Sequence, residues 1–301
     1  MMNIFRSTVF LTIIVSIGFV SPMKSAAQAG SRYDETIDAW RIKRLAELKA
    51  ENGWLNLAGL YWLEPGKNTM GQSPKNDFVC ELPNMPVTAG FFTLKKGKVY
   101  WNSAGGVEVK MLDKPVKKAI IFENGRPVPV LNMGSFRWNI IRRDDKLGVR
   151  LRDLNHPGMK AFDKLPYFPT DTTWRLDAKF VAGNNDSVMI SNMIGQTHAQ
   201  HSPGKLYFKV GDKEYSLDAL ESGKEDLFII FADHTNGNET YASGRYLYVP
   251  KADADGMIEL DFNKAINPPC VFTPFATCPI PPRQNRLPFA VSAGEKMIEK
   301  K

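Results

Sequence analysis

Short apolar runs separated by turn-forming residues fill most of this chain. From Trp54 onward, Gly, Pro, Asn or Asp interrupts the apolar runs roughly every eight to twelve residues. Runs of this length, bounded by residues that favour reversals, are typical of β-strands joined by tight turns. We therefore predict an all-β fold, mainly antiparallel, with two β-rich halves and a Pro-rich loop near the C-terminus.

Turn chemistry places three hairpins in the first half. They are predicted to join 91–94 to 99–101 across Lys96-Gly97, 119–123 to 127–131 across Asn124-Gly125, and 138–142 to 149–152 across 144–148. Lys-Gly and Asn-Gly pairs supply the positive φ angles that two-residue turns need.

A second series of strands follows the Pro-bearing stretch 163–173. The predicted strands are 174–182, 187–193, 206–210, 214–217, 227–232, 240–249 and 257–262. Because 227–232 is apolar on both faces, we expect it to lie centrally in its sheet, whereas 257–262 alternates and has one solvated face. The first β-rich half is predicted to span 54–165, and the second 166–301.

One amphipathic helix precedes the strands, within residues 30–53. Its apolar stripe includes Ile37, Trp40 and the pair Arg44/Leu45. Ser31 is a candidate N-cap, and Gly53 follows the expected end of the helix. We expect this helix to pack on a sheet.

The first 29 residues have the pattern of a signal peptide. A cation at Arg6 precedes the apolar run 9–20, and small residues at Ala27 and Ala29 supply a cleavage site. The apolar run is shorter than the roughly 20 residues that span a bilayer as a helix, so a retained anchor is the weaker alternative. The sequence predicts a protein of the periplasm or a secreted protein, which is not integral to the membrane after cleavage.

Three cysteines remain: Cys80, Cys270 and Cys278. In an oxidising compartment the two close ones are expected to form a disulfide inside a loop containing six prolines, between 267 and 282. Thiolate metal ligands or a reactive thiol are the alternatives for this pair. Cys80 lies in an apolar run and is expected to be a buried thiol.

Charge and motifs exclude several functions. Lys and Arg number 39 against 32 Asp and Glu, but no stretch gathers more than three adjacent cations, so we expect no nucleic-acid partner. Common motifs for serine hydrolases, zinc proteases and phosphate loops are absent from the sequence, and we predict no cofactor and no metal site. His198 and His201 are interpreted as exposed loop residues.

The stretch 233–245 carries the strongest concentration of polar chemistry. Asp233 ends a buried strand, and Glu239, Tyr241 and Arg245 are expected to share one face of the returning strand. Two interpretations remain open here: a turn stabilised by side chains and an Arg–carboxylate pair, or a polar pocket floor. The candidate ligand-binding residues are Asp233, Thr235, Glu239, Tyr241, Arg245, Asn285 and Arg286.

Our leading functional hypothesis is a non-catalytic module that binds a small polar or anionic ligand, or an envelope protein, beside the Pro-rich loop. The alternative is a hydrolase in which Asp233 or Glu239 is the base, His234 or Tyr241 the proton partner, and Arg245 an anion clamp. A structural envelope component is the third possibility, favoured by a large apolar patch without a pocket.

The motifs of the second half resemble those of a bacterial and archaeal family, domain of unknown function number sixteen eighty-four. The resemblance rests on Asp233, Thr235, Gly237, Glu239-Thr240-Tyr241, Gly244-Arg245, Leu260-Asp261-Phe262-Asn263, Asn267-Pro268-Pro269-Cys270, Cys278-Pro279, Asn285-Arg286-Leu287 and Ala293-Gly294-Glu295, and upstream on 54–59, Trp62-Leu63, Gly66, Gly71 and 149–153. It implies no substrate, cofactor or catalytic residue.

The first half is weakly similar to forkhead-associated β-sandwiches. The shared positions are Gly66, Gly71, Asn76-Asp77, Leu82, Gly97, Asn124-Gly125 and 130–135. Gln72 follows Gly71 where those modules carry Arg, and no Ser-x-x-His occurs in this half. The likeness therefore implies the architecture alone, without phosphothreonine binding.

Overall fold

The computed structural model describes residues 23–298, and its regular structure consists mainly of antiparallel β-sheets. The predicted fold class, all-β and mainly antiparallel with an N-terminal helix, is confirmed. Residues 1–22 of the predicted signal peptide lie outside the described residues. Within residues 23–298, no helix combines the length and apolar character that crossing a membrane requires.

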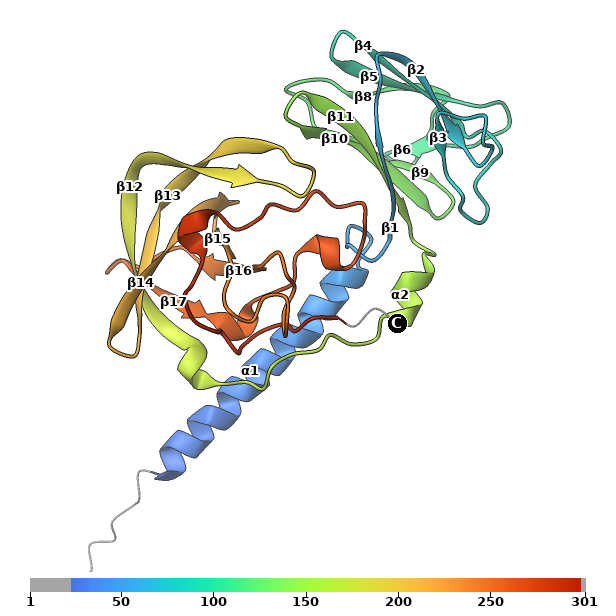
Figure 1. The fold of residues 1–301 in the computed structure, drawn as a ribbon. Coiled ribbons are helices and arrows are strands. Elements are labelled where there is room, and N and C mark those ends of the chain that lie inside the picture. The colour runs from blue at the N-terminus through green and yellow to red at the C-terminus, as the bar shows by residue number, and fades with distance from the viewer. Residues whose placement is uncertain (1–22, 299–301) are drawn as a thin grey trace, which may run out of the picture.

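The N-terminal helix α1 spans Met23–Lys49, so the prediction that it starts at Ser31 was wrong. Alanines are frequent before Ser31, and alanine is the strongest helix former. Gly53 follows the helix end as predicted, and a Cβ atom there would lie 2.7 Å from the carbonyl oxygen of Glu47. Figure 1 shows α1 running beside the second β-rich half and leading into β1 (Leu57–Trp62).

Two sheets make up the first half. The five-stranded sheet has the order β3-β2-β4-β5-β8, with β2 Gly66–Gly71, β3 Phe78–Val79, β4 Gly90–Lys95, β5 Lys98–Ser103 and β8 Lys118–Phe122. The six-stranded sheet has the order β1-β11-β10-β9-β6-β7, with β6 Lys110–Met111, β7 Lys114–Pro115, β9 Leu131–Met133, β10 Phe136–Arg143 and β11 Lys146–Asp153.

Aromatic side chains from both sheets meet in one hydrophobic cluster. Trp101 of β5 and Trp138 of β10 are fully buried, and their ring centroids lie 5.0 Å apart. Phe92 of β4 packs on Trp101 at 4.8 Å. Because these rings come from different sheets, the two sheets of this half share a core.

Two of the three predicted hairpins are confirmed. Lys95 pairs with Lys98 across Lys96-Gly97, and Arg143 pairs with Lys146 in a tighter turn than expected. The prediction of a hairpin across Asn124-Gly125 was wrong. The strand before it, β8, pairs with β5 in one sheet, while β9 after it pairs with β10 and β6 in the other. Pro127 and Pro129 prevent the chain from extending a ladder immediately after this turn.

The second half is one sheet in the order β16-β15-β14-β13-β12-β17, which curls into a nearly closed barrel. Its strands are β12 Arg175–Ser191, β13 Thr197–Val210, β14 Lys213–Ser222, β15 Asp226–Phe231, β16 Arg245–Pro250 and β17 Met257–Asp261. β12 merges two predicted strands, and β15 has a neighbour on each side as predicted. Phe231, Leu260 and Phe262 are fully buried in its core.

The predicted strand 240–249 begins only at Arg245. Residues 233–244 form a loop in which the main-chain N–H groups of Glu239 and Thr240 both donate to the carbonyl of Thr235. Gly244 has a φ of 89°, which ends the loop directly before β16. The expectation that Glu239, Tyr241 and Arg245 share a strand face was therefore wrong.

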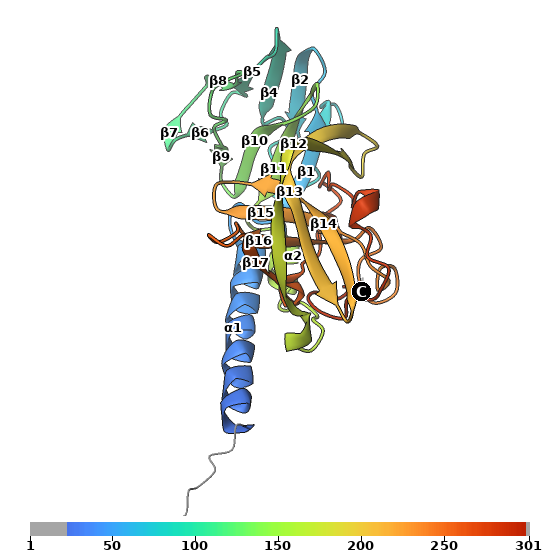
Figure 2. The same ribbon diagram turned by 90° about the vertical axis from the view of Figure 1, so that its left-hand side faces the viewer.

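Short helices occupy the connections. They are α2 Pro157–Ala161, η1 Thr172–Trp174, η2 Phe262–Lys264, η3 Pro269–Val271 and η4 Arg283–Asn285. Figure 2 shows the sheets of the two halves gathered at one end of α1. The main hydrophobic clusters of the two halves contain different residues, and the predicted residue boundaries between the halves stay a prediction.

Candidate functional site

Arg245 is fully buried at the start of β16 and pairs with Asp233. Its Nη2 atom lies 2.8 Å from Oδ2 of Asp233 and donates to the carbonyl of Val291 at 2.8 Å, and Nη1 donates to the carbonyl of Ala293. The guanidinium also lies over the ring of Phe231, 5.3 Å from its centroid. Arg245 thus fastens the C-terminal segment to the barrel and has no exposed surface for a ligand.

The second oxygen of Asp233 is occupied as well. Its Oδ1 accepts bonds from the main-chain N–H of Thr235 at 2.8 Å, from the Thr235 hydroxyl at 2.5 Å and from the N–H of Val291 at 3.3 Å. Burial lowers the pKa of Arg245, and the Asp233 carboxylate opposes that decrease. This geometry corresponds to the interpretation as a side-chain-stabilised turn.

The remaining predicted ligand residues have different surroundings. Asn285 is buried and joins two strands, because its side chain bonds to the main chain of Asp218 and of Ile230. Arg286 is exposed, and Tyr241 is half-buried. The Glu239 carboxylate is about half exposed and lies 4.0 Å from Nζ of Lys296. The structure brings Asp233, Thr235 and Arg245 together in the interior rather than at a pocket.

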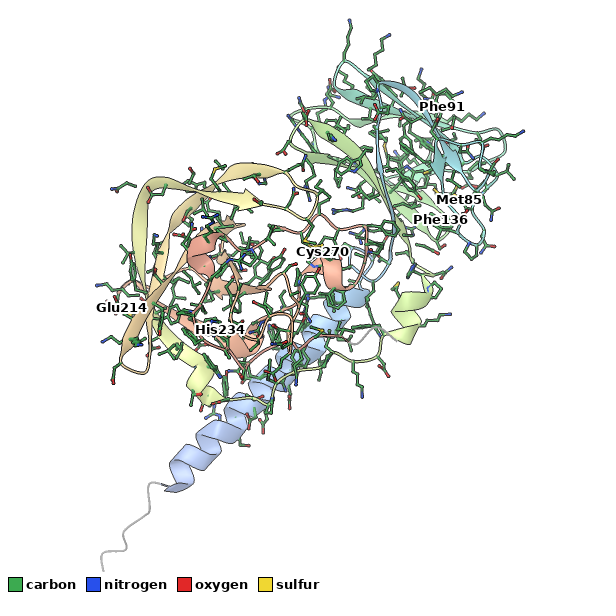
Figure 3. All side chains as sticks on the ribbon, viewed as in Figure 1. Met85, Phe91, Phe136, Glu214, His234 and Cys270 are labelled. Atoms are coloured by element: carbon green, nitrogen blue, oxygen red, sulfur yellow. A yellow bond between two sulfur atoms is a disulfide. The ribbon has the colours of Figure 1, made fainter. Side chains whose placement is uncertain are left out.

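The Pro-rich loop 267–282 contains the predicted cysteine pair. Cys270 and Cys278 are positioned as a disulfide, with Cα atoms 6.2 Å apart, inside the range that such bonds occupy. Figure 3 shows Cys270 close to the junction of the two halves. Thr277 of this loop accepts a bond from Nε of Arg143 at 2.9 Å, and the carbonyl of Pro279 accepts one from the Tyr246 hydroxyl at 2.8 Å. The loop therefore contacts both halves.

A cavity of about 670 Å³ lies between α1, β16 and the start of the Pro-rich loop, and we call it the α1–β16 cleft. Its aromatic lining residues are Trp40, Trp54, Tyr246 and Tyr248, and its polar ones include Lys43, Arg44, Glu47, Asn52, Asp226, Lys264 and Asn267. Aromatic walls with a few polar groups are typical of small-molecule sites.

A buried ion pair fixes one side of the cleft. Nε of Arg44 lies 2.9 Å from Oε1 of Glu295, whose side chain is fully buried. The other carboxylate oxygen accepts the main-chain N–H of Asn267 at 2.7 Å. Burial raises the pKa of Glu295, and the Arg44 charge acts in the opposite direction. The arrangement links the helix to the first residue of the Pro-rich loop.

Asn267 leaves one polar atom without a partner. Its Nδ2 donates to the carbonyl of Lys296 at 2.9 Å, but its Oδ1 is buried and accepts no hydrogen bond. A buried acceptor without a partner costs free energy, on the order of 1–3 kcal/mol. Asn267 lines the cleft, but its side chain has no exposed surface, so this oxygen contributes to how the wall is built and not to contact with a ligand.

The tyrosines of β16 form an aromatic wall of the cleft. Tyr248 is 46% exposed and stacks on Phe228, with ring centroids 4.9 Å apart. Burial raises the pKa of both Tyr246 and Tyr248, so both hydroxyls remain protonated at neutral pH. The Tyr248 ring combines an apolar face with a neutral polar group at the edge of the cleft.

One sequence feature pointed to this site, and we interpreted it as packing. Arg44 occupies a position in the apolar stripe of the helix, where a cation is expected only with a buried partner. Asn267 begins the motif Asn267-Pro268-Pro269-Cys270, which we assigned to a rigid loop.

Within the described part of the chain, no group of three or more His, Cys, Asp or Glu side chains is arranged to hold a metal ion. His198 and His201 lie on β13 rather than in a loop, and the His201 side chain is 46% exposed.

Comparison with known proteins identifies the second half. Residues 160–296 match the model of a family described as protein of unknown function (DUF1684). The solution NMR structure of an uncharacterised protein from Haloarcula marismortui is similar to this chain, with 30% sequence identity, 46% of this chain and 78% of that chain covered, and a TM-score of 0.39. No curated protein matches the chain.

Proposed function

The chain belongs to the DUF1684 family through residues 160–296, and we propose that it is an exported, non-catalytic protein that binds a small polar ligand in the α1–β16 cleft. The observation that carries the proposal is the cleft itself, a cavity of about 670 Å³ whose wall includes the half-exposed ring of Tyr248 beside polar residues. The ligand that this chemistry fits has polar groups for exposed lining residues such as Asn52 and Asp226 and an apolar face for Tyr248.

The charges around the cleft favour a ligand that carries both acceptors and donors. Arg44 is neutralised by Glu295, and Lys264 by Asp261 at 3.1 Å, which leaves no large excess of either sign. At the exposed margin of the cleft, Nζ of Lys43 lies 3.8 Å from Oε1 of Glu47. A hydroxylated or zwitterionic molecule matches such a mixed lining better than a highly charged anion does.

The hydrolase alternative is supported less well by the geometry. Both oxygens of Asp233 are engaged by Arg245 and Thr235, so this carboxylate is not free to accept a proton from water. His234 is exposed although Asp233 is buried. The structural alternative required a surface without a pocket, and the α1–β16 cleft argues against it.

Export follows from the sequence pattern of residues 1–29 and is part of the proposal. Cleavage after Ala29 leaves Gly30 as the first residue of the mature protein, which retains the part of α1 that carries Trp40 and Arg44. Intact-mass analysis of the secreted or periplasmic fraction tests this: a mature N-terminus at Gly30 supports export, and an uncleaved chain retained in the cells contradicts it.

Ligand binding is tested by tryptophan fluorescence, because Trp40 and Trp54 line the cleft. Amino acids, monosaccharides, disaccharides and short peptides are titrated into the full protein. We expect at least one of these classes to change the emission saturably, and the variant Trp40→Phe to lose much of that change. A saturable signal that Trp40→Phe and Tyr248→Ala leave unaltered would place binding elsewhere and contradict the proposal.

A further inference from the structure

A second cavity lies on the outer face of the six-stranded sheet of the first half. It has a volume of about 990 Å³, and we call it the β10–β11 groove. Its charged lining residues are three arginines and two carboxylates: Arg137, Arg150, Arg152, Glu51 and Asp113. Asn132 and apolar residues of the segment 127–130 line it as well. This groove plays no part in the function proposed above.

Strand register places its cations side by side. Arg137 of β10 pairs with Arg152 of β11, and Asn139 of β10 pairs with Arg150. Residues two apart on a strand share a face, so Arg150 and Arg152 lie on the same side of the sheet. Neighbouring like charges repel each other, and such an arrangement is stable only where each cation finds compensating partners.

Two of the three arginines have such partners. Nε of Arg137 lies 2.8 Å from Oε1 of Glu51, and Nη1 of Arg152 donates to Oδ1 of Asn56 at 2.7 Å and to the carbonyl of Gly53. Both are therefore engaged at the end of α1.

Arg150 differs from its neighbours. Its Nε and Nη2 atoms are buried and make no hydrogen bond, and within residues 23–298 no carboxylate forms an ion pair with it. Its guanidinium lies 5.3 Å from the centroid of the Trp54 ring, which provides a flat support. Burial lowers the pKa of Arg150 to about 10, and the charges of Arg143 and Arg152 lower it further. An uncompensated, mostly buried guanidinium is an anion-binding group without its anion.

The rim of the groove is apolar and exposed. Ile120, Val128 and Val130 line the groove and are 44%, 37% and 46% exposed. Pro127 and Pro129 restrict the backbone of this rim, so that ordering it around a ligand costs little conformational entropy. The groove thus has a floor that carries arginines and a rim that is apolar. A molecule with an acidic head and an alkyl chain matches both parts.

We propose that the β10–β11 groove binds an amphiphilic anion, with its acidic head on Arg150 and its alkyl chain along Val128 and Val130.

Isothermal titration calorimetry of the full protein tests the proposal, with sodium decanoate below its micelle concentration as the probe. Sodium acetate presents the head without the chain, and an uncharged decyl glycoside presents the chain without the charge. We expect decanoate to bind at least about tenfold more tightly than either. If acetate bound as tightly as decanoate, the groove would be a simple anion site. If the glycoside bound as tightly as decanoate, the groove would recognise only the alkyl chain. Either result overturns the proposal.

Variants then locate the binding. Arg150→Met is expected to weaken decanoate binding at least about tenfold, because it removes the charge and keeps the bulk of the side chain. Arg142→Met is the matched control: it removes an exposed arginine of the neighbouring strand, β10, outside the groove. Equal weakening by both variants would show non-specific attraction and overturn the proposal.

Val130→Glu provides a second test that does not depend on the folding of Arg150→Met. Val130 is 46% exposed, so the new carboxylate does not disturb a packed core. Its negative charge at the rim should weaken decanoate binding, and the glycoside should be affected less. Unchanged decanoate binding in Val130→Glu would contradict the proposed location.

Discussion

Arg44 and Glu295 form an ion pair that joins α1 to the C-terminal segment, with Nε and Oε1 2.9 Å apart across 251 residues of sequence. Because Glu295 also accepts the N–H of Asn267, the pair determines how the helix and the Pro-rich loop meet at the α1–β16 cleft. Arg44 lies before the residues that match the family model, and Glu295 lies within them. The cleft is thus built jointly by the family domain and the preceding helix.

Removing the charge of Glu295 should destabilise the protein strongly. The variant Glu295→Gln leaves the Arg44 guanidinium, which is only 10% exposed, without a counter-charge, and breaking a buried pair in this way costs about 3 to 5 kcal/mol. Urea unfolding measures the change in free energy. Glu47→Gln, which removes a 57% exposed carboxylate of α1 near Lys43, is the control and should cost less than about 1 kcal/mol. Similar costs for both variants would refute the structural role of the buried pair.

Arg245 and Asp233 should behave as a coupled structural pair. Arg245→Met and Asp233→Leu should each lower stability markedly, since each leaves one buried charge unpaired, and the double variant should be less destabilised than the sum of the two. A double-mutant cycle by denaturant unfolding measures this coupling. If Arg245→Met abolished ligand binding and left the melting temperature unchanged, Arg245 would be a ligand contact after all.

Cys80 should be unreactive in the folded protein. It is 1% exposed, and burial raises the pKa of its thiol above the ordinary value of 9.0. An aromatic disulfide reagent should therefore label no thiol in the native state and one after unfolding, with the other two cysteines paired. Rapid labelling of the native protein at neutral pH would contradict the burial of Cys80.

The same shift links stability to pH. In the unfolded chain Cys80 loses its proton near pH 9, whereas in the folded protein it keeps it, so the folded state binds more protons above that pH. The contribution of the protonated Cys80 thiol to the free energy of unfolding is complete below pH 9 and is lost as the pH rises above it. Cys80→Ala should show a smaller decrease in the free energy of unfolding between pH 8.5 and about 10 than the wild type.

Local sequence signals predicted the strands better than they predicted the sheets. Lys96-Gly97 and Asn124-Gly125 both mark reversals, but only the first joins strands that pair with each other. A turn depends on backbone conformation at two residues, whereas the choice of sheet depends on packing between distant segments such as Trp101 and Trp138. The pairing of β8 with β5 was therefore beyond local patterns.

In the candidate site, too, local contacts could be predicted from the sequence, whereas contacts between distant segments could not. Sequence spacing correctly suggested that Asp233 and Arg245 meet, because they flank one loop. It did not reveal that both are buried, since burial results from the C-terminal segment that carries Val291 and closes over them. Arg44 and Asn267 lie 223 residues apart and meet only in the folded chain, so their cleft had no local sequence signature.

The central claim is that the α1–β16 cleft holds a small polar ligand, and native mass spectrometry of protein isolated without refolding tests it most directly. We expect the wild type and Tyr100→Ala, a tyrosine variant on β5 outside the cleft, to retain the same small-molecule adduct. Tyr248→Ala should lose that adduct, because it removes the exposed aromatic wall of the cleft. An adduct retained equally by Tyr248→Ala, or a wild type without any adduct that also fails to bind every class of the fluorescence panel, would contradict the claim.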